Sequence, residues 1–158
     1  MNKEKYILGV TGSIGCGKSY TCRKLVDLGR ERDIPISYID VDTIRRKTPP
    51  RELRATLSRR ITDEQGLVLF EWALLVEDGL MPLVEGVLLV ECNYETQLKR
   101  LIGGDLPGEE VKRRINAQLS NDEKEKIIKQ SGKKFYIFDS SQNPNDSQYQ
   151  RLLEEIIK

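Results

Sequence analysis

The chain has 158 residues, a length typical of one domain, and we expect a single domain over residues 1–158. Lysine and arginine number 26 against 25 aspartates and glutamates, so the formal net charge is +1 and the chain as a whole is no polycation for nucleic acid or anionic lipid. Apolar runs stay well short of the roughly 20 residues that a membrane span needs, and the N-terminal segment lacks a signal-peptide pattern. We therefore expect a cytoplasmic protein.

The cysteine and histidine content limits the chemistry. Cys16, Cys22 and Cys92 are an odd number without CxxC spacing, so neither a disulfide framework nor a thiolate zinc site is expected. Histidine is absent, which excludes histidine general bases, Ser-His-Asp and Cys-His nucleophiles and almost all ordinary zinc catalysis. Carboxylates, lysine, arginine, hydroxyls and backbone amides remain.

In the first part of the chain, strand and helix patterns alternate. Residues 6–11 form an apolar run that ends in a glycine cluster, which is typical of a buried parallel strand. The spacing over 18–28 predicts a helix that stops at Gly29, and the β-branched run 34–39 predicts a second strand. Residues 43–61 are polar and basic, and we expect helix on both sides of Pro49 and Pro50, which interrupt any continuous helix.

The alternation continues to the C-terminus. The runs 66–71 and 86–91 predict the third and fourth strands, with a short helix over 72–80 between them. Helices are expected over 94–102, 109–119, 122–130 and 148–157, and a fifth strand over 135–138. Strands that alternate with helices imply βαβ units, so we expect an α/β fold of three layers, a five-stranded parallel sheet with helices on both faces.

The strongest motif lies between the first strand and the first helix. Residues 12–19, GSIGCGKS, match GxxxxGK[ST] at every fixed position, in the strand-to-helix context that the motif requires. The glycines let successive backbone N–H groups face a phosphate, and the helix start adds partial positive charge. The motif indicates a P-loop NTPase-type fold that binds a nucleoside triphosphate and Mg²⁺.

Individual roles within this phosphate loop follow from its chemistry. We expect Lys18 to reach the β- and γ-phosphates and the Ser19 hydroxyl to bind Mg²⁺. Cys16 lies where a helix N-terminus can activate a thiol, although a small residue that merely fits the loop is the plainer interpretation. The residues expected to contact the nucleotide are Gly12, Ser13, Ile14, Gly15, Cys16, Gly17, Lys18, Ser19 and Tyr20.

The second predicted strand leads into Asp40 and Asp42, at the edge of the sheet where open α/β folds bind ligands. A carboxylate there can accept a proton from an acceptor hydroxyl or hold Mg²⁺ through water. Helix capping by Asp42 is the alternative.

Several segments together resemble the dephospho-CoA kinase family. The sequence GVTGSIGCGKS at 9–19, with IDVDTI at 39–44, is similar to the opening of that family. LLVEDGL at 74–80, VLLV at 87–90 and ETQLKRL at 95–101 resemble its following segments, and Arg114, Ile115 and Gln118, with Lys124 beyond, resemble its lid. The segments occur in the family's order over about two thirds of the chain.

The resemblance implies transfer of the γ-phosphoryl group of ATP to the ribose 3'-hydroxyl of dephospho-CoA, in coenzyme A biosynthesis. It places the catalytic base on Asp42 and a phosphate-contacting lid arginine on Arg114, so the expected catalytic residues are Lys18, Asp42 and Arg114. The expected metal ligands are Ser19 and Asp42. The implied partners are ATP and a phosphorylated or pyrophosphate-bearing small molecule.

The chain departs from the family on the acceptor side. Residues 43–65 occupy the place of a longer helical acceptor-binding insertion, and Gly104, in the lid region 103–118, stands where the family commonly has arginine. A nucleoside or nucleotide kinase with a compact acceptor site is therefore an alternative. A nucleotide-binding module without transferase activity is another.

Positive charge gathers in the shortened segment. Residues 43–62 carry seven basic side chains and one acidic one, a net charge of +6, so the rest of the chain carries −5. Such a cluster suits a clamp on a phosphorylated acceptor or, equally, a solvated helix face. No nucleic acid is expected, because the segment lacks aromatic residues for base stacking. The basic residues are Arg45, Arg46, Lys47, Arg51, Arg54, Arg59 and Arg60.

Overall fold

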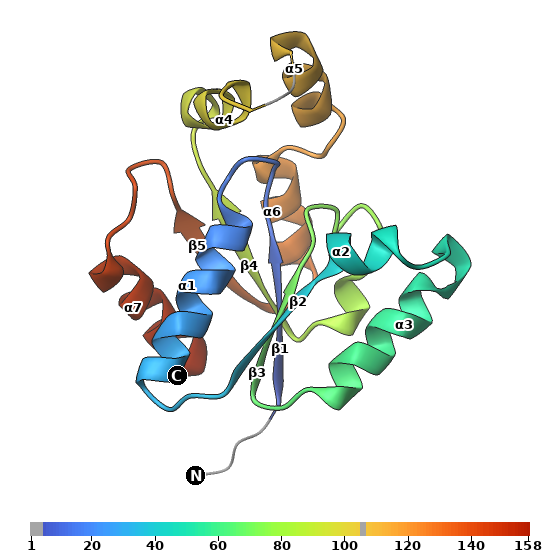
Figure 1. The fold of residues 1–158 in the computed structure, drawn as a ribbon, viewed down its shortest axis with the longest axis vertical. Helices are drawn as coiled ribbons and strands as arrows, with labels where there is room; N and C mark the ends of the chain where they lie inside the picture. The colour runs from blue at the N-terminus through green and yellow to red at the C-terminus, as the bar shows by residue number, and fades with distance from the viewer. Residues whose placement is uncertain (1–4, 105–106) are drawn as a thin grey trace.

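The computed structural model describes residues 5–104 and 107–158, and within them a five-stranded parallel sheet forms the centre of the molecule (Figure 1). The strands follow the order β2-β3-β1-β4-β5, and every neighbouring pair is parallel. The expected α/β fold of P-loop type is confirmed. The strands are β1 (Tyr6–Thr11), β2 (Ile36–Asp40), β3 (Leu67–Glu71), β4 (Gly86–Glu91) and β5 (Lys134–Asp139).

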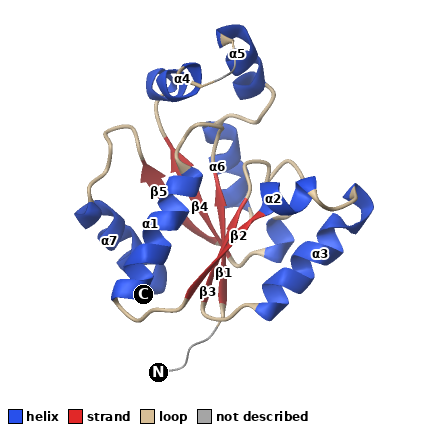
Figure 2. Ribbon diagram, in the orientation of Figure 1, coloured by secondary structure: helices blue, strands red, loops and turns tan. Residues whose placement is uncertain are grey.

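Helices lie on both faces of the sheet and beyond the carboxyl ends of its strands, as Figure 2 shows. In the described residues none of them is both long and apolar enough to cross a membrane. The helices are α1 (Lys18–Glu31), α2 (Val41–Arg46), α3 (Pro50–Asp63), the 3₁₀ helix η1 (Met81–Leu83), α4 (Tyr94–Ile102), α5 (Gly108–Asn116), α6 (Asn121–Gln130) and α7 (Asp146–Ile157).

Two hydrophobic cores hold the layers together. On one face α1 and α7 pack on the sheet, where Leu25 and Leu152 join Leu8 in the first core. On the other face α3 and α6 contribute Leu57 and Ile128 to the second core. Because β1 is central and hydrogen-bonds to both β3 and β4, the phosphate loop that follows it emerges in the middle of the sheet's carboxyl edge. In Figure 1, α4 and α5 lie above this edge.

Most predicted elements are present, but the short helix predicted over 72–80 is wrong. The segment forms consecutive turns, closed by a hydrogen bond of 2.6 Å from the Trp72 Nε1–H to Asp78 Oδ2. Trp72, Leu75 and Leu80 are all buried, so the segment folds back onto the second core instead of presenting one helical face. The expected break at Pro49 and Pro50 is confirmed, because α2 ends before it and α3 starts at the second proline.

Gly29 does not end the first helix, which continues to Glu31. A Cβ atom at Gly29 would lie 2.6 Å from Ile36 Cδ1 and 2.9 Å from the Ile34 carbonyl oxygen. The glycine is required because the chain returning into β2 passes close to the helix. Its role is close packing and not helix termination.

We predict that Gly29→Ala destabilises the fold by roughly 1–3 kcal/mol, although alanine favours helix more than glycine does, because the added methyl group overpacks this contact. Urea denaturation would measure the change. Gly108→Ala is the matched control, since a Cβ there has no neighbour within 4 Å. Equal stabilities for the two variants would contradict this explanation.

Candidate active site

The phosphate loop rests on the end of β4. The three glycines of the loop, Gly12, Gly15 and Gly17, have positive φ angles of 148°, 80° and 88°. A Cβ atom at Gly12 would lie 2.1 Å from the Val90 carbonyl oxygen, so only glycine allows this approach. The loop therefore has the backbone conformation that the motif predicts.

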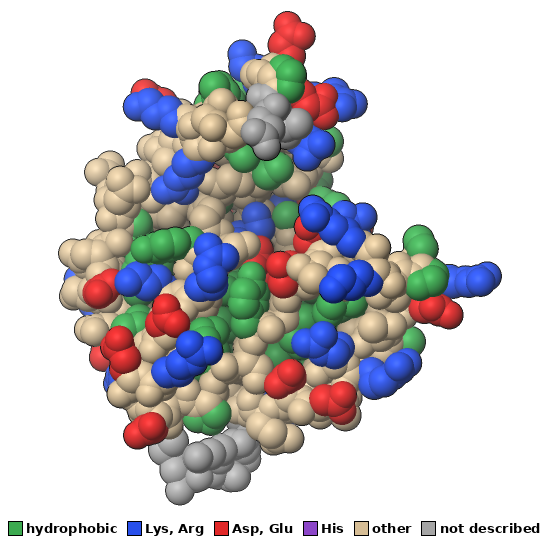
Figure 3. Space-filling view, viewed as in Figure 1, with side chains coloured by type: hydrophobic (Ala, Val, Ile, Leu, Met, Phe, Trp, Pro, Cys, Tyr) green, Lys and Arg blue, Asp and Glu red, His purple; other side chains and the backbone are tan. Residues whose placement is uncertain are grey.

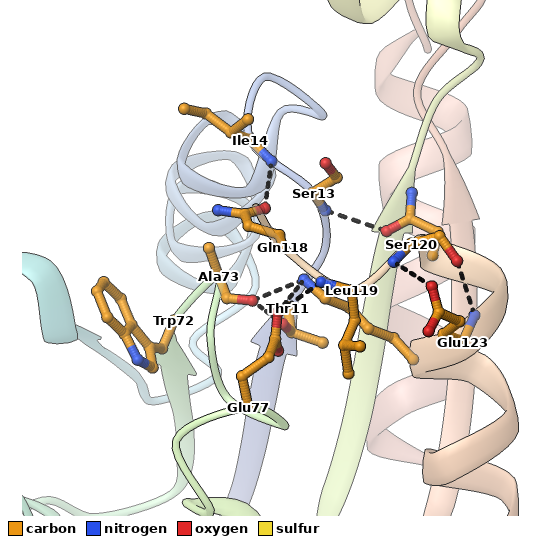
Figure 4. A network of polar contacts seen from close by, with 12 residues as sticks. Thr11, Ser13, Ile14, Trp72, Ala73, Glu77, Gln118, Leu119, Ser120 and Glu123 are labelled. Atoms are coloured by element: carbon orange, nitrogen blue, oxygen red, sulfur yellow. Dashed lines mark hydrogen bonds and ion pairs between the residues drawn. The ribbon is translucent and has the colours of Figure 1, made fainter. Parts of the chain in front are cut away.

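Side-chain amides from distant segments hold the first turn of the loop (Figure 4). The Asn121 Oδ1 atom accepts from the Ser13 N–H at 3.0 Å, and the Gln118 Oε1 atom accepts from the Ile14 N–H at 3.2 Å. The Gln97 Nε2 group donates to Ser13 Oγ at 2.6 Å and to the Ile14 carbonyl at 2.7 Å. Helix α4 and the start of α6 thus fix the loop from outside.

A cavity of about 590 Å³ opens on one side of the loop, a volume that suits a nucleoside. Arg100 from α4 donates to the carbonyl oxygens of Gly15 at 3.3 Å and Ser140 at 2.7 Å, and Ser140 Oγ donates to the Cys16 carbonyl at 2.7 Å. The segment after β5 and helix α4 are thereby joined to the loop. The lining residues are Gly15, Gly17, Tyr20, Arg100, Leu101, Ser140, Asn143, Pro144 and Tyr149.

The three residues predicted to be catalytic line a second cavity, of about 350 Å³, on the other side of the loop. Lys18 comes from the start of α1, Asp42 from α2 and Arg114 from α5. Ser19 and Ile14 of the loop line the same cavity. The structure therefore brings together residues that lie as far apart in the sequence as positions 14 and 114.

Glu71 is an additional residue of this cavity, and the sequence did not place it. It ends β3, next to β1, and it is only 7% exposed. Ser19 Oγ donates to both of its carboxylate oxygens, at 3.0 and 3.1 Å, and the Tyr38 hydroxyl donates to its Oε1 atom. Burial lowers the pKa of Lys18, and the nearby Glu71 carboxylate opposes that shift.

These donors fit Mg²⁺. A serine hydroxyl and a carboxylate in contact are hard oxygen ligands, and Mg²⁺ usually takes only one or two carboxylates, with water and substrate phosphates completing its coordination. Among the described residues there is no cluster of three or more histidine, cysteine, aspartate or glutamate residues that would hold a metal without such help. Ser19 and Glu71 are therefore the residues that would hold it beside a bound phosphate.

The two aspartates at the end of β2 and the start of α2 have different roles. Asp40 caps α2, since its carboxylate accepts from the Asp42 N–H at 3.1 Å and from Thr43 Oγ1 at 3.0 Å. Capping, the alternative considered for Asp42, thus belongs to Asp40. The Asp42 carboxylate instead pairs with Arg45 at 3.0 Å and Arg46 at 2.8 Å, at the edge of the cavity.

The basic segment divides between the site and the solvent. Arg45 and Arg46 line the second cavity, and Arg45 lies 5.4 Å from the ring centre of Trp72. The basic residues of α3 are exposed, and Figure 3 shows basic side chains gathered over the α2 and α3 side of the molecule. The basic side chains at the cavity and those in solvent therefore lie on different helices.

Lys124 is buried beneath the site. Its Nζ atom donates to the Ala73 carbonyl at 2.7 Å and lies 3.7 Å from a Glu77 carboxylate oxygen, and Thr11 Oγ1 donates to the same carbonyl at 3.1 Å. Glu77 also accepts from the Leu119 N–H at 3.2 Å. Figure 4 shows Thr11, Ala73, Glu77 and Leu119 converging here. Burial lowers the pKa of Lys124 to about 8, and Glu77 opposes the shift.

Comparison with known families decides what kind of protein carries this site. A family model described as dephospho-CoA kinase matches residues 49–131, which is more than half of the chain. The chain belongs to the dephospho-CoA kinase family. It is an ATP-dependent kinase. The matched region begins after the phosphate loop at 12–19, so the loop and the family match are separate indications of the same class of enzyme.

Solved structures share the fold. The crystal structure of TT1252 from Thermus thermophilus aligns with a TM-score of 0.72 at 23% identity, over 98% of this chain and 97% of that one. A shikimate kinase from Bacteroides thetaiotaomicron aligns with a TM-score of 0.62 at 14% identity, over 97% and 99%. An uncharacterized protein from Eubacterium ventriosum aligns at 0.56 and 12%, over 97% and 99%. Among curated proteins, no relative matches the chain.

We predict that Lys124→Met removes a pH dependence of stability. Between about pH 8 and 10.5 the unfolded chain holds a proton on Lys124 that the folded protein does not, so the free energy of unfolding of the natural protein rises with pH across this range. The variant lacks this contribution, which amounts to roughly 3 kcal/mol. Urea denaturation of both proteins from pH 7.5 to 11 measures the difference.

Lys126→Met, an exposed position on the same helix, is the matched control. If the free energies of unfolding of the natural protein and Lys124→Met differ by a constant amount over the whole pH range, titration of Lys124 does not cause the pH dependence of stability.

Proposed function

We propose that this kinase transfers the γ-phosphoryl group of ATP to the ribose 3'-hydroxyl of dephospho-CoA, and that one domain over residues 1–158 carries both substrate sites. The observation that carries the proposal is that Lys18, Asp42 and Arg114 line one cavity next to a nucleoside-sized one, with the phosphate loop between them. The choice of dephospho-CoA as the acceptor rests on membership of the dephospho-CoA kinase family.

Each residue has a role that its position supports. The loop amides, Lys18 and Arg114 hold the phosphates and stabilise the charge that spreads over the transferred group. Ser19 and Glu71 would hold Mg²⁺, which would supply positive charge against the phosphates. Asp42 accepts the proton of the acceptor hydroxyl. Asp42, which the sequence also suggested as a metal ligand, lies beside this pair in the same cavity.

The pairing of Asp42 with two arginines favours an anionic acceptor. A phosphate or pyrophosphate group of the acceptor can take up the Arg45 and Arg46 guanidinium groups, since guanidinium binds phosphate bidentately. The Asp42 carboxylate is then released to act as a base. Acceptor binding and base activation are thereby coupled, and an acceptor without an anionic group would leave Asp42 paired.

A second candidate is a kinase for a smaller anionic acceptor. The volume of the second cavity, about 350 Å³, favours it, as does the short 43–65 segment. A shikimate kinase aligns with nearly its whole chain, so the fold at this length also occurs in a kinase of a compact acceptor. The same arginines and Asp42 would serve in either case.

The direct test incubates the protein with ATP, Mg²⁺ and dephospho-CoA and detects CoA by mass spectrometry. We expect CoA to form only when all three are present. Parallel reactions offer nucleosides, nucleoside monophosphates and small hydroxy acids. Turnover of a nucleoside monophosphate or a hydroxy acid without CoA formation would replace the first proposal by the second, turnover of a nucleoside would contradict the need for an anionic acceptor, and ATP binding without any transfer would refute both.

Two variants separate the roles of nucleotide contact and base. We expect Asp42→Asn to leave ATP affinity within a few fold but to slow phosphoryl transfer by a factor on the order of 10². Lys18→Ala is expected to weaken ATP binding itself by about tenfold or more, because it removes a charge-assisted contact to phosphate. Calorimetric ATP titration and single-turnover rates measure the two effects. Normal turnover by Asp42→Asn would exclude Asp42 as the base.

A further inference from the structure

Two thiols lie against each other beneath the phosphate loop. Cys16 is the fifth residue of GSIGCGKS and is fully buried, whereas Cys92 directly follows β4 and is partly exposed. The Cys92 thiol donates to Cys16 Sγ, and the two sulfur atoms are 3.2 Å apart, which is about 1.2 Å longer than a disulfide bond. The residues are 76 positions apart in the chain, so the fold creates this contact.

Sheet pairing and loop packing fix the contact. Strands β1 and β4 are hydrogen-bonded neighbours, and Gly12 rests on the Val90 carbonyl just before Cys92. On the opposite side of the loop, Ser140 Oγ donates to the Cys16 carbonyl at 2.7 Å, and the Ser140 N–H donates to the Glu91 carbonyl at 2.8 Å. The loop and the end of β4 therefore remain together as one unit.

The surroundings of Cys92 set its reactivity. Burial, and then the hydrogen bond with Cys16, raise the pKa of the Cys92 thiol to about 12. The Arg100 guanidinium acts in the opposite direction, and Asp139 acts in the same direction as burial. Only a small fraction of Cys92 is thiolate near neutral pH, so its oxidation is slow there and accelerates in alkaline solution.

We propose that Cys16 and Cys92 form a reversible disulfide bond when low-molecular-weight disulfides oxidise them, and that this bond prevents the phosphate loop from binding nucleotide. The Cys92 thiolate attacks one sulfur of the oxidant, breaks its S–S bond and releases one small thiol. Cys16 then attacks the Cys92 sulfur and releases the second. The two protein thiols lose two electrons and two protons, which leave on the two small thiols. Disulfides in reducing compartments are commonly of this transient kind.

In the proposal, closure of the bond moves the phosphate loop. The sulfur atoms have to approach by more than 1 Å, which draws Cys16 toward β4 and displaces the neighbouring backbone N–H groups that face a bound phosphate. Nucleotide affinity therefore falls on oxidation. By linkage, bound nucleotide favours the dithiol form by the same factor. The inference depends on nucleotide binding to the loop and is independent of which acceptor the kinase uses.

The test equilibrates the full chain with mixtures of oxidised and reduced glutathione. We expect the oxidised protein to lose about 2 Da, to resist alkylation at two cysteines, and to yield a cross-linked peptide pair that contains positions 16 and 92. Calorimetry should show ADP binding to the oxidised form at least about tenfold more weakly, and saturating ADP should shift the glutathione ratio at half oxidation toward the dithiol.

Two variants complete the test. Cys92→Ser should bind ADP with unchanged affinity in reducing and oxidising buffers, whereas Cys22→Ala should keep the oxidation-dependent loss, since Cys22 lies in the first core and takes no part in the contact between Cys16 and Cys92. A glutathione adduct on Cys92 without the cross-link would overturn the proposal. So would a cross-linked protein that binds ADP normally. Peptide mapping and ADP titration of the natural protein detect these two outcomes even if a variant fails to fold.

Discussion

Close packing of the phosphate loop against the carboxyl end of β4 is the constraint on which the site depends. Because Gly12 touches the Val90 carbonyl, the loop cannot move away from the sheet without losing that support. The position of β1 between β3 and β4 then determines the neighbours of the loop on each side. Glu71 reaches it from β3 and Cys92 from β4. One feature of strand order thus places a buried carboxylate and a second thiol beside the same eight residues.

The three arginines of the second cavity are paired with carboxylates before any ligand binds. Arg45 and Arg46 pair with Asp42, and Arg114 pairs with Glu110 at 3.3 Å, each partner being one helical turn away on the same helix. Such exposed pairs contribute little to stability, because solvent screens them and ordering the side chains costs entropy. An anionic ligand can therefore replace the carboxylates at small cost. The carboxylates thus reduce the electrostatic repulsion between the arginines, and the weak pairs are easily broken when a ligand binds.

The sequence predicted what depends on neighbouring residues and missed what depends on strand order. The phosphate loop is eight consecutive residues, so its position and backbone conformation followed directly. Asp42 and Arg114 came from the family resemblance, and the structure places both at one cavity. Glu71 could not be placed, because that required knowing that β3, and not β2, pairs with β1. The contact of Cys16 with Cys92 has the same origin, and an odd number of cysteines without CxxC spacing gave no indication of it.

The acceptor side shows what the short 43–65 segment does. Helix α3 packs Leu57 and Ile61 into the second core, so it covers the sheet and is not a separate binding unit. Its arginines are exposed, and of the two helices in this part of the chain only α2 brings basic side chains to the cavity. In the proposed function, recognition of an acceptor therefore falls to the three short pieces that line the cavity: α2, the turns after β3 and helix α5. None of them belongs to the sheet, and the buried Lys124 ties the turns after β3 to α6.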